Sequence, residues 1–181
     1  IITGFGGLVS LKLLDNYLQL GLDWLWIPGI VFAGLGAVYT AFLFNQARAR
    51  DLWQTPIVSA IHMLVHAVMA GSIVMMVISP DTIEWMAKSL FCGIVLSMVI
   101  IAKEILLPHD TKDTRKAIQL MTKGYYSKHF WSGVMIGYII PLIILLTLSR
   151  DWFFIAGGFV LIGIFLTEFV RIRVPQLIPL S

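Results

Sequence analysis

The chain has 181 residues, of which 59% are hydrophobic and only 13% are charged. Soluble domains carry about a quarter charged residues, so this composition excludes an ordinary water-soluble enzyme and indicates a protein embedded in a lipid bilayer. The net charge of +3 is small, and we expect no nucleic-acid partner. The single cysteine, Cys92, excludes an internal disulfide and a cysteine-ligated iron–sulfur cluster within this chain.

Long apolar stretches set the fold class. Five of them have about the length that an α-helix needs to cross roughly 30 Å of hydrocarbon, and they cover residues 24–45, 56–78, 86–107, 130–148 and 152–170. Residues 1–11 are apolar but too short to span alone, so we interpret them as the end of an earlier helix in a longer protein. The sequence therefore predicts an all-α polytopic transmembrane helix bundle. It is a single membrane domain over residues 1–181, with five membrane-spanning helices plus the tail of a preceding one.

Asp15, Asn16 and Tyr17 form a polar trio just before the first complete helix. Loop residues at a membrane interface are often only solvated. A quinone headgroup bound at the membrane edge would need hydrogen-bond donors and acceptors of this kind. The trio is therefore our candidate quinone-binding site.

His62 and His66 lie one turn apart near the middle of the second predicted helix. A neutral histidine inside a membrane can ligate haem or relay protons. Two residues on one face of a helix cannot clamp opposite sides of the same iron, so we expect no haem in this chain. Two interpretations stay open, a proton relay and a pair of structural histidines bonded to the backbone or to hydroxyls such as that of Ser59.

Two acidic residues lie near the ends of predicted helices. Glu104 follows Lys103, where it either extends to the membrane surface or forms the inner port of a proton path. Glu168 precedes Arg171 by three residues, a spacing that favours an ion pair on one helix face. We expect a proton path made of His62, His66, Glu104 and Glu168. We see no metal-binding motif and no set of catalytic residues.

Small residues recur at four-residue spacing in three helices: Gly29, Ala33, Ala37 and Ala41 in the first, Ala67 and Gly71 in the second, and Gly133 and Gly137 in the fourth. Such ridges let helices approach closely and predict a packed bundle. Pro141 is internal to its helix and should kink it.

The link between the third and fourth spans is predicted to be structured. In residues 112–128, polar and apolar side chains alternate as in a short amphipathic helix on the inner surface, and Gly124 should end it.

Basic residues predict the orientation. With alternating crossings, ten of the 13 Lys and Arg fall on one side, namely Arg48, Arg50, Lys103, Lys112, Arg115, Lys116, Lys123, Lys128, Arg171 and Arg173. Lys12, Lys88 and Arg150 fall on the other, where Trp24, Trp26, Trp85 and Trp152 also gather. Since positive residues stay in the cytoplasm and aromatic residues mark the interfaces, we expect a cytoplasmic C-terminus.

Three stretches together resemble the NrfD/PsrC family of membrane subunits. The first is Tyr39–Pro56, YTAFLFNQARARDLWQTP, although Asp51 stands where the family has a proline. The second runs from Leu120 and Gly124 through Trp131 and Gly137 to Pro141. The third is Gly163, Glu168 and Arg171.

The resemblance implies a quinone-interacting anchor, similar to subunits of polysulfide and nitrite reductases and of alternative complex three. It also implies eight helices, of which these five would be the fourth to eighth. The family's quinone pocket lies mainly in the first four helices, so only the edge formed by residues 15–17 would fall in this sequence.

We therefore expect a non-autonomous subunit of an oxidoreductase complex, in contact with an iron–sulfur (ferredoxin-like) subunit and a catalytic subunit. Its cofactor would be a quinone, menaquinone or ubiquinone, with no haem or iron–sulfur cluster of its own. The alternative is a proton-coupled transporter or ion-translocating subunit without direct quinone chemistry. A b-type cytochrome anchor fits the histidine spacing less well.

Overall fold

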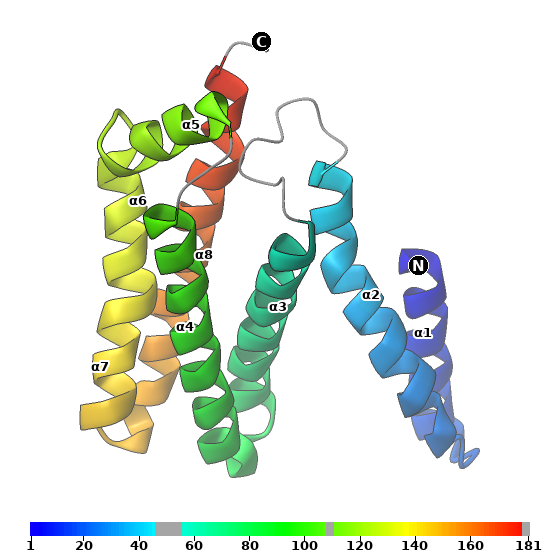
Figure 1. Ribbon diagram of the computed structural model, residues 1–181. Coiled ribbons are helices and arrows are strands. Elements are labelled where there is room, and N and C mark those ends of the chain that lie inside the picture. The colour runs from blue at the N-terminus through cyan, green and yellow to red at the C-terminus, as the bar shows by residue number, and fades with distance from the viewer. Residues whose placement is uncertain (46–55, 108–110, 179–181) are drawn as a thin grey trace.

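The structure is a computed structural model that describes residues 1–45, 56–107 and 111–178, and within these ranges every regular element is helical (Figure 1). The long helices are α1 (Ile2–Leu18), α2 (Trp26–Asn45), α3 (Pro56–Ile78), α4 (Ile83–Leu106) and α8 (Phe153–Arg173). The shorter ones are α5 (Lys112–Thr122), α6 (Ser127–Val134) and α7 (Ile140–Thr147). Single 3-10 turns at Asp23–Leu25, Pro80–Thr82, Arg150–Trp152 and Pro175–Leu177 connect or end them.

Five helical stretches in the described residues are long and apolar enough to cross a membrane, as predicted. They are Asp23–Leu43, Ile57–Ile78, Pro80–Leu106, Ser127–Thr147 and Arg150–Leu177. The third and fourth begin a few residues earlier than the sequence suggested. α1 continues to Leu18, so Asp15, Asn16 and Tyr17 form its last turn. The expectation that they belong to a loop was therefore wrong.

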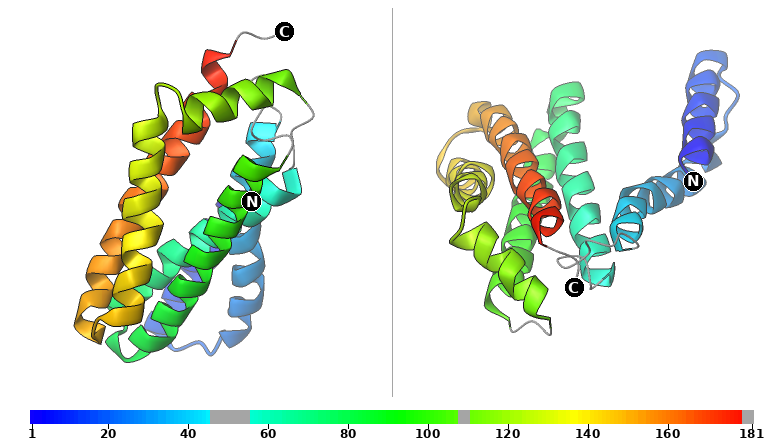
Figure 2. Two further views of the ribbon diagram at one scale, coloured as in Figure 1. Left: turned by 60° about the vertical axis from the view of Figure 1, so that its left-hand side comes forward. Right: turned by 90° about the horizontal axis from the view of Figure 1, so that it is seen from above.

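The helices form a main bundle with a two-helix side arm. α3, α4, α8 and the α6–α7 pair stand side by side, and α2 joins them along α3, while α1 lies against α2 at the outer edge (Figure 2). Buried apolar side chains such as Met69, Leu90 and Val160 fill the centre of the main bundle. Large exposed apolar residues such as Ile57 and Phe165 cover its outer faces, where a bilayer would solvate them.

The fourth span is interrupted at Pro141. A π-helical turn, Met135–Ile139, joins α6 to α7, and Pro141 stands in the first turn of α7. Proline has no N–H to donate to the carbonyl four residues back, and its ring clashes with that carbonyl. A wider turn ahead of the proline relieves that clash, so the disturbance expected at Pro141 takes the form of a π turn.

Two helical segments approach each other very closely at Gly137 and Gly163. A Cβ placed on Gly137 would lie 2.4 Å from the Cα of Gly163, so α8 and the π turn touch backbone to backbone. Gly133 packs as closely, since a Cβ there would lie 3.0 Å from side-chain atoms of Leu166 and Thr167. This part of the predicted small-residue packing is confirmed.

The other small-residue ridges behave differently. Ala67 and Gly71 are exposed, and Gly71 has no neighbour within 4 Å of a Cβ position. α3 instead packs Met69 onto Gly93 of α4, so the expectation for the Ala67–Gly71 pair does not hold within the described residues. On α2, Ala41 is fully buried, whereas Gly29 has no close neighbour.

The predicted amphipathic helix is α5, which crosses one end of the bundle (Figure 1). Thr111 caps its start by accepting a hydrogen bond from the Thr114 N–H at 3.1 Å. Ala117, Ile118 and Met121 are buried against the bundle. The N–H of Gly124 donates to the Gln119 carbonyl at 2.9 Å and ends the helix as expected.

Charged and aromatic residues separate between the two ends of the bundle. α2, α4 and α8 start at the same end, so the exposed side chains of Trp24, Trp26, Trp85 and Trp152 all lie toward that end. The opposite end carries α5 and the last turns of α4 and α8, with most of the basic residues. Arg48, Arg50 and His109, and with them most of the Tyr39–Pro56 motif, lie outside the described residues.

Candidate functional site: a buried polar network

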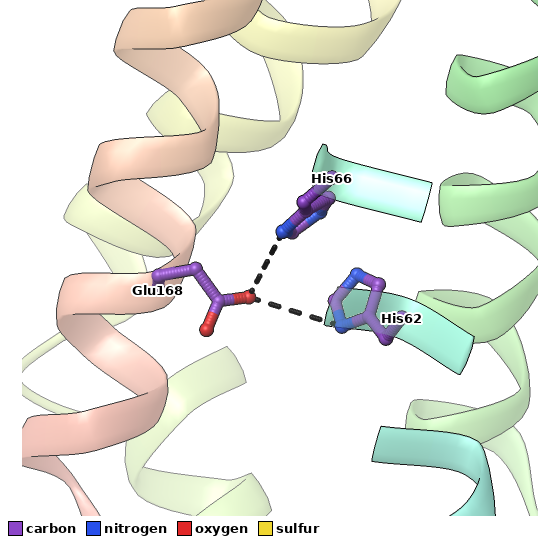
Figure 3. A group of neighbouring side chains, drawn as sticks. All are labelled: His62, His66 and Glu168. Carbon is purple, nitrogen blue, oxygen red and sulfur yellow. Dashed lines mark ion pairs between the residues drawn. The ribbon is translucent and has the colours of Figure 1, made fainter. Parts of the chain in front are cut away.

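The two histidines of α3 and Glu168 of α8 point toward one another inside the bundle (Figure 3). Nδ1 of His66 lies 3.6 Å from Oε1 of Glu168, and Nδ1 of His62 lies 3.8 Å from the same oxygen. The centroids of the two imidazole rings are 4.1 Å apart. Because residues four apart share one face of a helix, both rings can meet the same partner.

Arg171, nearly one turn beyond Glu168 on α8, joins this group to α4. Its Nη2 lies 3.1 Å from each carboxylate oxygen of Glu104, and its Nη1 lies 3.4 Å from Oε1 of Glu168. Nη1 also contacts Nδ1 of His62. The side chain of Arg171 is only 4% exposed. One cation therefore bridges two carboxylates and an imidazole from three helices.

Tyr138 of the π turn extends the network on the other side of His66. Its hydroxyl oxygen lies 3.3 Å from Nε2 of His66 and 3.5 Å from the hydroxyl oxygen of Thr167. The Thr167 hydroxyl donates to the Gly163 carbonyl at 2.9 Å. Tyr138 and His62 expose no surface, so these contacts are shielded from solvent.

The network runs from one end of the bundle toward its middle. Glu104 and Arg171 lie in the last turns of α4 and α8. His66 lies ~15 Å along α3 from Pro56 at a rise of ~1.5 Å per residue. That depth is about half of a ~30 Å hydrocarbon core. A connected set of polar groups therefore reaches mid-membrane.

The charges of the network indicate that it can bind one exchangeable proton. Arg171 is always ionised, and an ionised Glu104 balances it through two contacts. If Glu168 were also ionised, the group would carry one excess negative charge in a medium that penalises buried charge. Oε2 of Glu168 is buried and has no hydrogen-bond partner among the described residues. A proton bound by Glu168 or by a neighbouring imidazole would remove the excess.

A metal ion fits this site less well than a proton does. Three possible ligand atoms lie within 4.8 Å of one another, one each from His62, His66 and Glu168, which is close enough to hold an ion. However, Nη1 of Arg171 already contacts both His62 and Glu168. A second cation would have to displace the guanidinium, so the geometry favours the arginine as the positive charge.

The structure brings the four residues of the predicted proton path, His62, His66, Glu104 and Glu168, into this one group. The predicted Glu168–Arg171 ion pair is also present. Proton transfer through the group stays a prediction. The sequence analysis missed Tyr138 and the contacts of Arg171 beyond its own helix. A tyrosine hydroxyl midway along an apolar span, three residues before a proline, was the available signal for Tyr138.

The predicted quinone-binding trio lies apart from this network. Asp15 is buried and accepts hydrogen bonds from Nζ of Lys12 at 2.6 Å and from the Leu22 N–H at 2.9 Å. The Lys12 ammonium and that N–H hold the pKa of the Asp15 carboxyl below its usual range. The carbonyl of Asn16 accepts from the Gln19 side chain, and Tyr17 is 84% exposed. The structure does not gather the three side chains into one pocket.

An apolar cavity of about 250 Å³ lies beside the trio, between α1 and α2. Its walls come from Phe5, Leu8, Val9, Lys12, Leu25, Trp26, Gly29, Ile30 and Ala33. Lys12 is its charged lining residue and connects it to Asp15. The cavity suits an apolar chain with a polar group at its edge.

Comparison with known proteins gives one finding. A family model described as "Polysulphide reductase, NrfD" matches residues 7–179. No curated protein and no solved structure matches the chain. The matched range covers the whole polar network as well as Lys12 and the trio at the end of α1.

Proposed function

The chain belongs to the polysulphide reductase NrfD family, and from this membership we propose that it exchanges electrons between the quinone pool and a peripheral iron–sulfur subunit. Membership makes it a membrane subunit of a quinone-linked reductase complex. The family match over nearly the whole chain is the observation that carries the proposal. The iron–sulfur subunit would in turn pass electrons to or from a catalytic subunit.

The quinone would bind at the α1–α2 edge, near Asp15, Asn16 and Tyr17. The apolar cavity fits part of an isoprenoid tail, and Lys12, as an ammonium donor, fits a quinone carbonyl oxygen. Asp15 holds Lys12 there. Menaquinone and ubiquinone both meet this description. The quinone, when bound, supplies the two-electron chemistry, and the chain supplies binding and proton access.

The buried network would conduct the protons that accompany quinone turnover. His62, His66 and Glu168 are titratable groups of the kind that pass protons within membranes, and Glu104 lies nearest the helix ends. We place that end, and the C-terminus, in the cytoplasm of a prokaryotic inner membrane. The same network also favours the alternative, an ion-translocating subunit without direct quinone chemistry.

One experiment separates these functions. The double variant His62→Phe, His66→Phe is made in the intact complex, and quinone-linked turnover, proton translocation and bound-quinone content are measured. We expect turnover or translocation to fall while quinone content and subunit composition are kept. Unchanged turnover and proton stoichiometry would remove the proton path. A complex that translocates protons but neither contains quinone nor reacts with it would favour the alternative.

A further inference from the structure

We propose that Tyr138 is a member of the proton path, the group through which His66 gains and loses protons on the side away from Glu168. This inference rests on the proposed proton path and extends it by one residue from a helix that the path did not include. It is carried by the position of the Tyr138 hydroxyl, 3.3 Å from Nε2 of His66 in a fully buried setting.

The contacts of His66 favour one direction for its hydrogen bonds. Its Nδ1 lies 3.6 Å from Oε1 of Glu168, within ion-pair reach but slightly beyond hydrogen-bond distance, and an ionised carboxylate there favours a proton on Nδ1 of the neutral ring. Nε2 is then an acceptor, and the Tyr138 hydroxyl must donate to it. The result is a row of polar groups from Tyr138 through His66 to Glu168, hydrogen-bonded at its Tyr138 end and in ion-pair contact at its Glu168 end.

Among the described residues, His62 has no equivalent pair of contacts. Its Nδ1 contacts Nη1 of Arg171, which can only donate, so this nitrogen accepts, and the same Nη1 lies 3.5 Å from Nε2. Its proton then lies on Nε2 and not on the atom that faces Glu168. His66 is therefore the imidazole with an acceptor on one side and a donor on the other, as a relay requires.

The transfer step is balanced and involves no electrons. The Tyr138 O–H bond breaks as an N–H bond forms at Nε2, and the Nδ1–H bond breaks as an O–H bond forms on Glu168. The reverse transfer, from Glu168 to Nδ1 and from Nε2 to the phenolate oxygen, restores the starting tautomer. For net transfer to Glu168 the phenolate instead takes a proton from a hydronium ion that enters the path, and rotation of the His66 ring then restores a proton on Nδ1.

The backbone around Tyr138 is built to hold this hydroxyl in place. Tyr138 lies in the π turn, and its neighbour Gly137 touches the backbone of Gly163. That contact brings the π turn against the face of α8 that carries Thr167 and Glu168. A π turn rotates the residues within it relative to a regular helix, and such turns are frequent at functional sites.

Tyr138→Phe tests the role because it removes the hydroxyl and keeps the ring. The purified complex is reconstituted in liposomes, and quinol-linked turnover, proton uptake and the solvent isotope effect are measured. We expect turnover to fall by about tenfold or more, with a larger isotope effect and unchanged subunit composition. Tyr126→Phe, in a half-buried tyrosine at the start of the same span, is the matched control and should behave as wild type.

The variant His66→Gln separates a failure of the inference about Tyr138 from a failure of the proton path itself. If Tyr138→Phe keeps full turnover and proton uptake while His66→Gln loses them, the inference about Tyr138 is wrong and the proton path stands. If both variants are fully active, the proton path itself is wrong.

A fluorinated tyrosine keeps the test decisive should the phenylalanine variant fail to assemble. Difluorotyrosine at position 138 retains the hydroxyl but lowers its pKa. A proton-carrying hydroxyl predicts that the alkaline limb of the pH–turnover profile moves to lower pH. An unmoved profile would show a merely structural hydroxyl and overturn the proposal.

Discussion

Arg171 places a permanent charge in the interior of a membrane bundle, where two carboxylates and an imidazole surround it. Removing the cation leaves two carboxylates buried without a counter-charge, which costs about 3–5 kcal/mol. We therefore expect Arg171→Gln to lower thermal stability and the yield of assembled complex strongly. Arg173→Gln, two residues further along and exposed, is the control and should have little effect. Equal stability of the two variants would show that the ion group contributes nothing to folding.

The two histidines should respond differently to the same substitution. An asparagine side chain places its amide oxygen near the position of Nδ1, so His62→Asn still offers an acceptor to Arg171. His66→Asn breaks the contact between Nε2 and Tyr138. We expect His62→Asn to retain clearly more proton-coupled turnover than His66→Asn, measured on complexes of equal subunit content. The opposite order would show that His62 carries the proton.

At this scale the sequence revealed which residues are chemically unusual but not how they meet. His62, His66, Glu104 and Glu168 were identifiable because polar groups are costly within apolar spans. Their grouping around Arg171 depends on how α3, α4 and α8 cross. The position of Tyr138 depends on a π turn, a local choice that side-chain periodicity does not encode.

Among the helices, the contact of Gly137 with Gly163 holds α8 against the π turn. Gly137→Ala would put a methyl group 2.4 Å from the Cα of Gly163, so the two backbones would have to separate. We expect a loss of about 1–3 kcal/mol, as for other overpacked sites, visible as a lower unfolding temperature. Gly158→Ala on α8 has open space around its Cβ position and should be neutral or slightly stabilising. A Gly137→Ala variant as stable as Gly158→Ala would contradict this packing.

The turn after α1 depends on one carboxylate. The ammonium of Lys12 and the N–H of Leu22 both donate to Asp15, and they lower its pKa. A group with a lowered pKa in the folded state stabilises the fold above its unfolded pKa, and that stability is lost as the pH falls through the folded value. We expect hydrogen-exchange protection of residues 19–25, corrected for intrinsic rates, to be constant near neutral pH and to fall only below about pH 4.

Asp15→Asn is the matched variant for this turn. It removes the carboxylate and keeps the size of the side chain, so protection should be weaker at every pH and should show no acid transition. An acid transition that persists in Asp15→Asn would assign the effect to another group.

For the molecule as a whole, the spans were predictable because the thickness of a bilayer sets the length of an apolar helix. The exact ends of the helices were harder to predict. α1 continues through Asp15 and Tyr17, although polar residues at this place suggested a loop. α5 was predictable from its amphipathic pattern, and its cap at Thr111 fixes where it begins. What the pattern could not give is the side-by-side order of the helices, which follows from contacts such as Gly93 with Met69.

The distribution of charge over the two ends predicts how the bundle sits in the membrane. At one end, Lys112, Lys116, Lys123 and Lys128 are exposed on or next to α5. At the other end the three basic side chains are engaged locally. Lys12 pairs with Asp15 and Asp23, Lys88 lies over the Trp85 ring, and Arg150 donates to the Pro80 carbonyl. Since positive residues near helix ends stay in the cytoplasm, we expect the α5 end to face inward.

Reporter fusions test this orientation directly. A fusion after Ile78, at the end of α3 opposite to α5, should report the outside, and a fusion after Ser181 should report the cytoplasm. Replacing Lys112, Lys116 and Lys123 together with glutamine should lower the fraction of correctly oriented protein, because it weakens the charge bias without touching a buried contact. A cytoplasmic Ile78 fusion or an external Ser181 fusion would invert the topology. The proposed entry of the proton path at Glu104 would then lie on the outer face.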